Sequence, residues 1–162
     1  MTFHTVWRIG VDVHTYSADN LNGEGAKVTG GRWNKKGTPV VYAAGSIALA
    51  CLETLVHLNF DDLPLNRYLV RIDVPIEIWR AAKKLTLKTA GAGWDALPAG
   101  MVSINKGEAW CKALSSAILV VPSIVIPHEF NVVINPLHKD TARIKSKKIE
   151  KFVYDTRLTK EG

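Results

Sequence analysis

Residues 67–74 (RYLVRIDV) constrain the fold most, because apolar or aromatic side chains recur at every second position. These side chains are Tyr68, Val70, Ile72 and Val74. In an extended chain they share one face, and Pro75 ends the segment. The sequence therefore predicts a β-strand here that packs one face against a core.

Other segments predict a mixture of strands and helices. Short runs of strand-forming residues are found at residues 3–9, 39–44, 117–121, 131–134 and 151–154. Helices are expected from Ser46, as the N-cap, to residue 58 and over residues 103–114, whereas residues 76–89 are ambiguous. The elements do not alternate as regular βαβ units, so we predict an α+β fold with a mixed or antiparallel sheet and flanking helices. Because the chain has 162 residues, we expect one domain over residues 1–162.

Composition and spacing exclude several classes of protein. The sequence has no secretory signal and no apolar run of the ~18 residues that a membrane-spanning helix needs, so we expect a cytoplasmic location. Cys51 and Cys111 lie in apolar surroundings, and the five histidines show no metal-ligand spacing, so no metal site is predicted. The formal charge of +6 would attract phosphate-bearing molecules. Residues 139–151 hold six of the basic side chains and are interpreted as a solvated edge rather than a nucleic-acid patch.

The segment from residue 16 to residue 38 is the first place to look for chemistry. It contains five glycines and few periodic apolar residues, which predicts a long functional loop or lid. No phosphate-binding loop, dinucleotide fingerprint or hydrolase motif is present. The segment does deliver Arg32, whose planar guanidinium can bind two oxygens of a phosphate. By itself, Arg32 is better explained as a surface arginine in an ion pair.

Three further side chains are candidates with simpler alternatives. Glu53 lies in the apolar sequence ALACLETLVHL, where a carboxylate is unusual. It indicates a paired carboxylate, a carboxylate at a cleft, or a narrow wet face shared with His57. Tyr42, in the short run PVVYAA, taken alone is a core aromatic residue. Ser123, between Pro122 and Ile124, taken alone is a turn residue.

Taken together, these segments resemble those of RES-domain proteins, the toxins of RES–Xre toxin–antitoxin modules. The resemblance rests on GGRWN with Arg32, ALACLE with Glu53 and VPS with Ser123, and covers nearly the whole chain. Further matching positions are Trp7, Arg8, Tyr42, Asn135 and Pro136. The segment INKGEAW is close to a family arrangement but shifted, and no role is assigned to it.

The resemblance implies a fold similar to diphtheria-toxin-like ADP-ribosyltransferases and an activity that degrades NAD by hydrolysis or phosphorolysis. Arg32, with Arg8, would hold the pyrophosphate, and Tyr42 would stack on the nicotinamide ring. Glu53 would stabilise the developing positive charge or orient the attacking group. Ser123 would fix Glu53 or the ribose by a hydrogen bond. NAD would be the substrate, so no cofactor is expected.

The resemblance also implies an Xre-family antitoxin as partner, with the toxin as a homodimer in the complex and no direct contact to membranes or nucleic acid. An ADP-ribosyltransferase that passes the ribose to a macromolecule is the alternative enzyme. A non-enzymatic nucleic-acid binder is a further alternative, supported by the charge but by no binding motif. A purely structural partner module would leave the placing of Arg32, Tyr42 and Glu53 unexplained.

Overall fold

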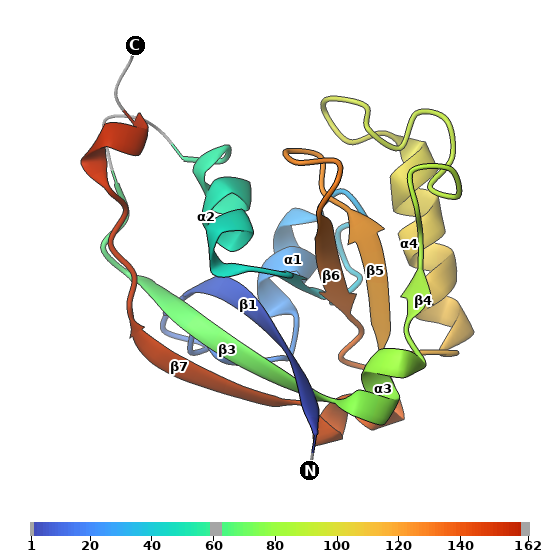
Figure 1. Cartoon of the computed structure of the whole chain (residues 1–162), viewed down its shortest axis with the longest axis horizontal. Coiled ribbons are helices and arrows are strands. Elements are labelled where there is room, and N and C mark those ends of the chain that lie inside the picture. The colour runs from blue at the N-terminus through green and yellow to red at the C-terminus, as the bar shows by residue number, and fades with distance from the viewer. Residues whose placement is uncertain (1, 59–62, 160–162) are drawn as a thin grey trace.

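A computed structural model describes residues 2–58 and 63–159 and shows one seven-stranded sheet with helices packed around it (Figure 1). The strand order is β4-β5-β6-β2-β1-β3-β7; β4 and β5 are parallel and the other neighbours antiparallel. The strands are β1 (Phe3–Val11), β2 (Val41–Ala44), β3 (Arg67–Pro75), β4 (Lys83–Lys84), β5 (Ile118–Pro122), β6 (Phe130–Ile134) and β7 (Lys145–Lys151). The α-helices are α1 (Glu24–Thr29), α2 (Ile47–Leu55), α3 (Ile76–Arg80) and α4 (Met101–Ala113), and Lys139–Arg143 and Thr156–Thr159 are 3₁₀ turns. The predicted α+β class with a mixed sheet is confirmed.

The sheet divides into two halves between β1 and β2. Those two strands share a single register pair, Trp7 with Ala44, whereas β1 pairs with β3 along its whole length. Figure 1 shows β1, β3 and β7 running across the direction of β5 and β6. The buried faces of the two halves enclose the largest apolar cluster, which includes Val6, Ile72 and Ile134.

The alternating segment at residues 67–74 forms β3, as predicted, and ends at Pro75. Val70, Ile72 and Val74 are fully buried in the cluster between the sheet halves. Leu69 points to the other face and packs in a second cluster with Ile9 and Leu49. Both faces of β3 therefore carry buried apolar side chains.

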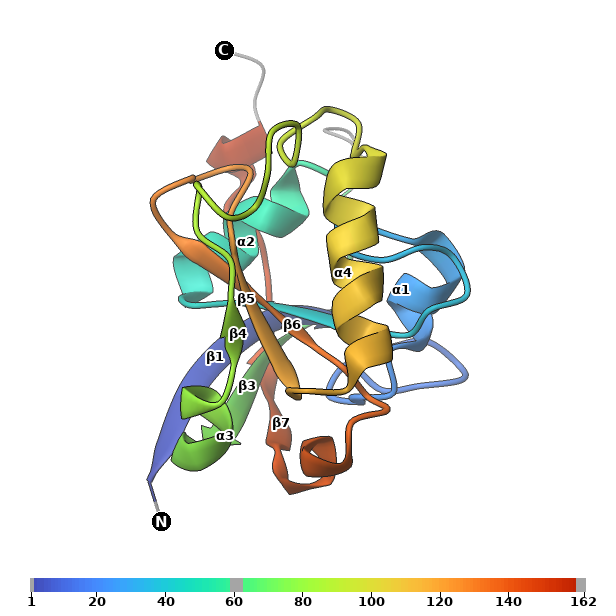
Figure 2. The same cartoon turned by 90° about the vertical axis from the view of Figure 1, so that its right-hand side faces the viewer.

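Helices α2 and α4 cover the face of the sheet opposite the largest apolar cluster, near the candidate residues (Figure 2). The predicted N-cap of α2 is confirmed, because Ser46 Oγ accepts a hydrogen bond from Leu49 N at 3.1 Å. The helix ends at Leu55, three residues earlier than predicted. α4 begins at Met101 and packs Trp110 against Leu119 of β5 in a third apolar cluster.

Two sequence predictions are wrong in detail. Residues 16–38 are not a continuous loop, because α1 forms inside them between Gly23 and Gly30, both of which have positive φ.

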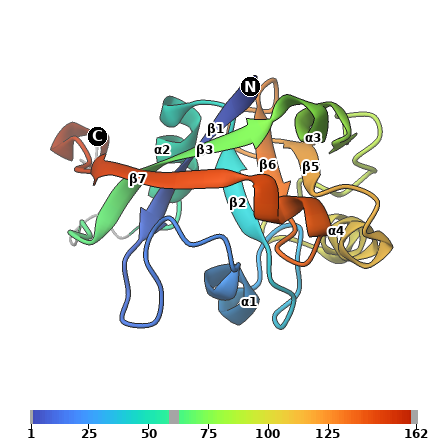
Figure 3. The same cartoon turned by 90° about the horizontal axis from the view of Figure 1, so that it is seen from below.

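The last strand is not residues 151–154 but β7, the lysine-rich edge strand visible in Figure 3. Lysines suit an exposed edge because they oppose pairing with another chain, so the solvated-edge interpretation is confirmed. The side chain of Tyr154 beyond this strand is buried among apolar residues. None of the described helices is long and apolar enough to cross a membrane.

Ser116 provides a test of this packing. Its hydroxyl accepts a hydrogen bond from the buried indole Nε1 of Trp110 at 3.0 Å and donates to Ile118 O at 2.9 Å. Ser116→Ala leaves the indole N–H without its acceptor, so the free energy of unfolding should fall by about 1–3 kcal/mol in urea denaturation. Ser115→Ala, at an exposed neighbouring position, is the control and should be neutral. Equal stability of the two variants would contradict this account of the α4–β5 junction.

Candidate active site

The carboxylate of Glu53 connects α2 to two strands of the sheet. Its Oε1 accepts hydrogen bonds from Ser123 Oγ at 2.5 Å and from Asn131 Nδ2 at 2.8 Å. Oε2 has no hydrogen-bond partner among the described residues. His57 lies beyond the end of α2 and is exposed. Of these interpretations, the structure shows Glu53 as a paired carboxylate and not as part of a wet face shared with His57.

Ser123 follows β5 directly and is fully buried. Its Oγ accepts hydrogen bonds from Val125 N at 3.1 Å and Ile126 N at 2.9 Å. These two bonds use both lone pairs of the hydroxyl oxygen, so the hydroxyl proton is directed to Glu53. In this arrangement Ser123 is a donor that orients Glu53, and no lone pair is left for nucleophilic attack.

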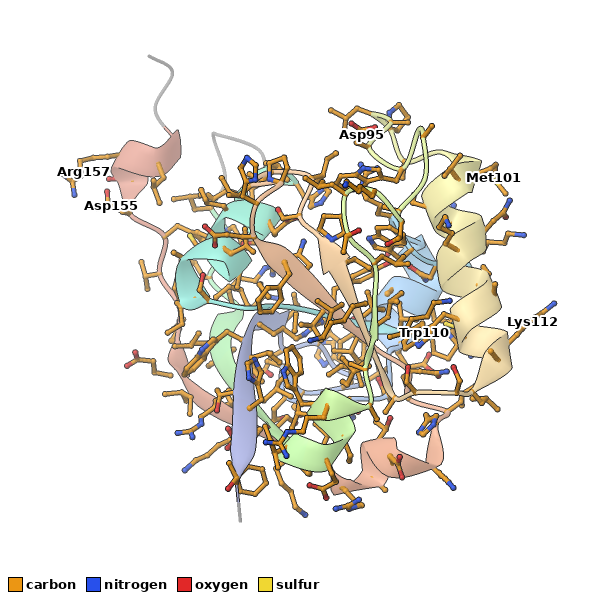
Figure 4. All side chains as sticks on the ribbon, turned by 45° about the vertical axis from the view of Figure 1, so that its right-hand side comes forward. Asp95, Met101, Trp110, Lys112, Asp155 and Arg157 are labelled. Carbon is orange, nitrogen blue, oxygen red and sulfur yellow. The ribbon has the colours of Figure 1, made fainter. Side chains whose placement is uncertain are left out.

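Arg32 lies in the turn between Gly31 and Asn34 and interacts electrostatically with Glu53. Its Nη1 donates to the carbonyl oxygens of Trp94 at 2.8 Å and Ala96 at 2.9 Å. Nε and Nη2 have no partner among the described residues, so one edge of the guanidinium is held and the other is uncommitted. Burial lowers the pKa of Arg32, and the nearby carboxylates of Glu53 and Asp95 oppose that shift. Figure 4 shows Asp95 in the loop that approaches the Met101 end of α4.

The hydroxyl of Tyr42 is committed to the same turn. It donates to Asn34 Oδ1 at 2.7 Å and accepts from Trp33 N at 3.0 Å. Burial raises the pKa of Tyr42, so the hydroxyl stays protonated. Only the ring of Tyr42 is therefore left to meet a ligand.

The structure does not bring Arg8 into this group. Trp7 is paired with Ala44, so its side chain lies on the same face of the sheet as those of Ala44 and Tyr42. Successive side chains of a strand point to opposite faces, so the Arg8 side chain projects from the other face. Its Nη1 donates to the backbone carbonyl of Tyr42 at 2.9 Å, and its Nε is buried without a partner among the described residues. Arg8 lines a small polar cavity with Tyr16 and lies behind Tyr42.

The segment INKGEAW, to which the sequence analysis assigned no role, holds the Arg32 turn against α4. Gly107 lies so close to the turn that a Cβ atom there would be 1.7 Å from Trp33 O. Glu108 Oε1 accepts hydrogen bonds from Lys35 N at 3.1 Å and Thr38 Oγ1 at 2.8 Å. This helix thus supports the turn from outside the sheet.

Asn34 holds the same turn from within. It is 1% exposed, and its Nδ2 lies within hydrogen-bonding distance of the carbonyl oxygens of Ala26, Lys35 and Thr38. These contacts hold the part of the segment from Gly30 to Thr38 in place in this structure, and a closing lid stays a prediction. Asn34 and Asn131 were not among the residues predicted for the site. Asn34 could have been found from its place in GGRWN, whereas Asn131 carries no local signal.

The chemistry available here is that of a carboxylate, a guanidinium and an aromatic ring. Among the described residues, no three His, Cys, Asp or Glu side chains are grouped so that they could hold a metal ion. Both cysteines are free, and burial raises the pKa of their thiols, that of Cys111 to about 11. The free edge of Arg32 can bind an anion, and Oε2 of Glu53 can stabilise a cation or accept from a hydroxyl.

Gly107→Ala tests the support of the Arg32 turn by α4. The added methyl group would collide with the carbonyl of Trp33, so turn or helix must move, and the free energy of unfolding should fall by about 1–3 kcal/mol or more in chemical denaturation. Gly100→Ala is the matched control, because the nearest atom to its new Cβ is 3.5 Å away and its φ of −99° suits alanine. A fully stable Gly107→Ala variant would show that the turn is not held in this way.

Comparison with known proteins places the chain in a family. The family model described as "RES domain" matches residues 5–155. A protein of Sphingobium sp. (strain YBL2) named "Prs ADP-ribosylating toxin" is 53% identical over 156 residues, covering 96% of this chain and 97% of that one. "Toxin Res" of Photorhabdus laumondii is 39% identical over 149 residues, covering 90% and 92%. The crystal structure of the M. tuberculosis MbcT–MbcA toxin–antitoxin complex contains a similar fold, with a TM-score of 0.61 and 17% identity over 98% of this chain and 87% of that one. The sequence resemblance is thus confirmed: the chain belongs to the RES domain family.

Proposed function

We propose that this chain is the toxin of a toxin–antitoxin module and that it cleaves the nicotinamide–ribose bond of NAD. The observation that carries the proposal is the arrangement of Glu53 and Arg32, each held on one side and free on the other. The names of the relatives, toxins in each case reported above, support the proposed role as a toxin. NAD is the substrate in this proposal, and no cofactor is required.

The proposed reaction matches what these side chains can do. Nicotinamide leaves the ribose as a neutral base and needs little protonation, so the main demand is to stabilise a ribose that resembles an oxocarbenium ion. The uncommitted Oε2 of Glu53 supplies a negative charge for that purpose. Ser123 acts through Glu53 by holding Oε1, and does not attack the substrate itself.

The remaining residues position NAD. Arg32 binds the pyrophosphate through Nε and Nη2, and the ring of Tyr42 stacks on the cationic nicotinamide, a contact worth roughly 0.5–2 kcal/mol. The predicted contact of Arg8 with the pyrophosphate would require its guanidinium to leave the carbonyl of Tyr42. The direct role of Arg8 therefore stays a prediction.

ADP-ribosyl transfer to a macromolecule is the second candidate. The relative named "Prs ADP-ribosylating toxin", at 53% identity, favours it, and the same site would serve both reactions. Incubation with NAD labelled in the adenosine part separates the candidates. Free ADP-ribose indicates hydrolysis, ADP-ribose 1″-phosphate indicates phosphorolysis, and labelled macromolecule indicates transfer. Recovery of all the label as intact NAD, with a range of acceptors present, would overturn the proposal.

Variants at Arg32 and Glu53 should separate binding from turnover. Glu53→Gln should lower kcat by at least about 100-fold because the charge that stabilises the transition state is lost. Arg32→Ala should mainly raise KM for NAD because it removes a ground-state contact with phosphate. The exposed residues Glu150 and Arg80 supply the charge-matched controls Glu150→Gln and Arg80→Ala, which should keep wild-type kinetics. Full activity of Glu53→Gln in a purified preparation without partner would remove Glu53 from the mechanism.

We further propose an Xre-family antitoxin that covers this site, with the toxin as a homodimer in the complex. An enzyme that drains NAD needs restraint, and a carboxylate of the partner can pair with the guanidinium edge of Arg32 that binds pyrophosphate. Excess NAD should then weaken the toxin–antitoxin affinity, as linkage requires, and the complex should not consume NAD. Calorimetric titration with and without NAD measures this; an affinity indifferent to NAD would contradict occlusion of the site.

A further inference from the structure

The net positive charge of this chain is concentrated in two segments that are far apart in the sequence. Residues 76–84 and 139–151 hold nine basic and three acidic side chains. The rest of the chain holds twelve basic and twelve acidic side chains, so these two segments account for the whole formal charge of +6. The sequence pI of about 9.4 therefore reflects one part of the molecule and not an even excess over its surface.

The fold brings the two segments together at one end of the half-sheet β1-β3-β7. α3 continues directly from the end of β3, and β7 begins beside that end, with Lys145 paired to Asp73. Arg143, in the 3₁₀ turn before β7, forms an ion pair with Glu77 of α3. Figure 3 shows α3, this turn and β7 on the side that faces the viewer. The charges of both segments therefore lie on one surface.

Six basic side chains at this end are exposed and have no ion-pair partner among the described residues. Burial and the nearby charge of Lys84 lower the pKa of His4, which places β4 beside the start of β1. The carboxylates of Glu77 and Asp73 are taken up by other ion pairs. The six side chains, which we call the basic end, are Arg80, Lys83, Lys84, Lys139, Lys145 and Lys147.

The basic end lies away from the candidate active site. Ser123 directly follows β5, and Asn131 is the second residue of β6. In Figure 1 these ends of β5 and β6 are at the top, whereas α3 and the 3₁₀ turn before β7 are at the bottom, and Figure 2 shows the same separation. A ligand at the basic end would thus leave Glu53 and Arg32 uncovered.

We propose that the basic end binds double-stranded DNA through its phosphate groups, without reading the base sequence. The unpaired charges come from α3, β4, the 3₁₀ turn and β7. A repeating phosphate polymer can meet all of them together, whereas a small anion would meet one or two. Lysine binds phosphate as a point charge, and contacts to phosphate carry no sequence information. This inference does not depend on the proposed cleavage of NAD.

A duplex suits this surface better than a single strand. Proteins that bind single strands combine positive charge with aromatic rings on which successive bases stack. Trp79 of α3 is already stacked on His4, with 3.7 Å between the ring centroids, and Phe3 is the one exposed aromatic side chain of β1 and α3. The sequence analysis considered residues 139–151 alone and predicted a solvated edge without nucleic acid. The charges of α3 and β4, which the fold adds, change that expectation.

The experiment measures binding of the purified chain to a fluorescein-labelled DNA duplex by fluorescence anisotropy at several salt concentrations. The dissociation constant should be about 10⁻⁶–10⁻⁴ M at physiological salt, as for other binding without sequence specificity. The slope of log K against log salt should be about −5, because each neutralised phosphate contributes about −0.9 and six side chains are available. A duplex of unrelated sequence should bind equally.

Two double variants locate the binding surface. Lys83→Gln/Lys84→Gln and Lys145→Gln/Lys147→Gln each remove two charges from the basic end. Each should weaken binding by at least about tenfold at ~50 mM salt and make the salt slope shallower by about 2, because two phosphate contacts are lost. The four positions are exposed, so both variants should fold, which far-UV circular dichroism checks.

Lys36→Gln/Arg157→Gln is the matched control. It removes the same charge from exposed positions outside the basic end and should bind DNA like the wild type. Equal weakening in the control and in the two double variants would assign the binding to net charge and overturn the inference. Tighter binding to single-stranded DNA or to phosphatidylserine vesicles than to the duplex would overturn the assignment to double-stranded DNA. No binding at low salt would overturn it as well.

The response to NAD separates this inference from the proposed function. A saturating non-hydrolysable NAD analogue should leave the DNA affinity unchanged, and the two double variants should consume NAD at the wild-type rate. DNA binding by a chain that consumes no NAD supports the inference and overturns the proposed function alone. DNA binding that the analogue abolishes would place the DNA at the candidate active site and overturn the inference.

Discussion

The carboxylate of Glu53 joins α2 to the two strands that line the site. It extends from α2 and receives hydrogen bonds from Ser123 after β5 and from Asn131 in β6. A partly buried carboxylate needs such donors, because desolvation without them is unfavourable. The hydrogen bonds to this oxygen join α2 to the sheet in addition to the apolar packing of Leu49, and the chemistry depends on leaving the other oxygen free.

A second set of contacts keeps Arg32 in reach of Glu53. The turn that carries Arg32 is supported by Asn34 from within, by Tyr42 from β2 and by Gly107 and Glu108 from α4. These contacts come from the turn itself and from two neighbouring elements, β2 and α4, and they attach the turn to the scaffold although its glycines suggest a mobile loop. A preorganised guanidinium gives up less conformational freedom on binding an anion, which suits a site that positions a pyrophosphate.

The local patterns of the sequence were sufficient for much of the fold. Alternation identified β3, the serine N-cap identified the start of α2, and the class of fold followed from the order of elements. The errors have physical causes. α1 is a single short helix bounded by glycines with positive φ, which no periodicity reveals. The final strand was predicted too late in the sequence, because β7 is an exposed edge rich in lysine. The apolar residues that follow it are buried without being in a strand.

For the site, the sequence by itself determined the side-chain types: a guanidinium between glycines, a carboxylate in an apolar helix, a tyrosine in a buried strand and a serine after a proline. These types follow from residue chemistry and local spacing. Only the tertiary structure decided which of them meet. Ser123 and Asn131 are 70 and 78 residues from Glu53 along the chain, and strand pairing brings all three together. Arg8, which the resemblance grouped with Arg32, is directed to the opposite face by the alternation of β1. Pairing between distant strands sets these distances and faces, and local sequence does not encode it.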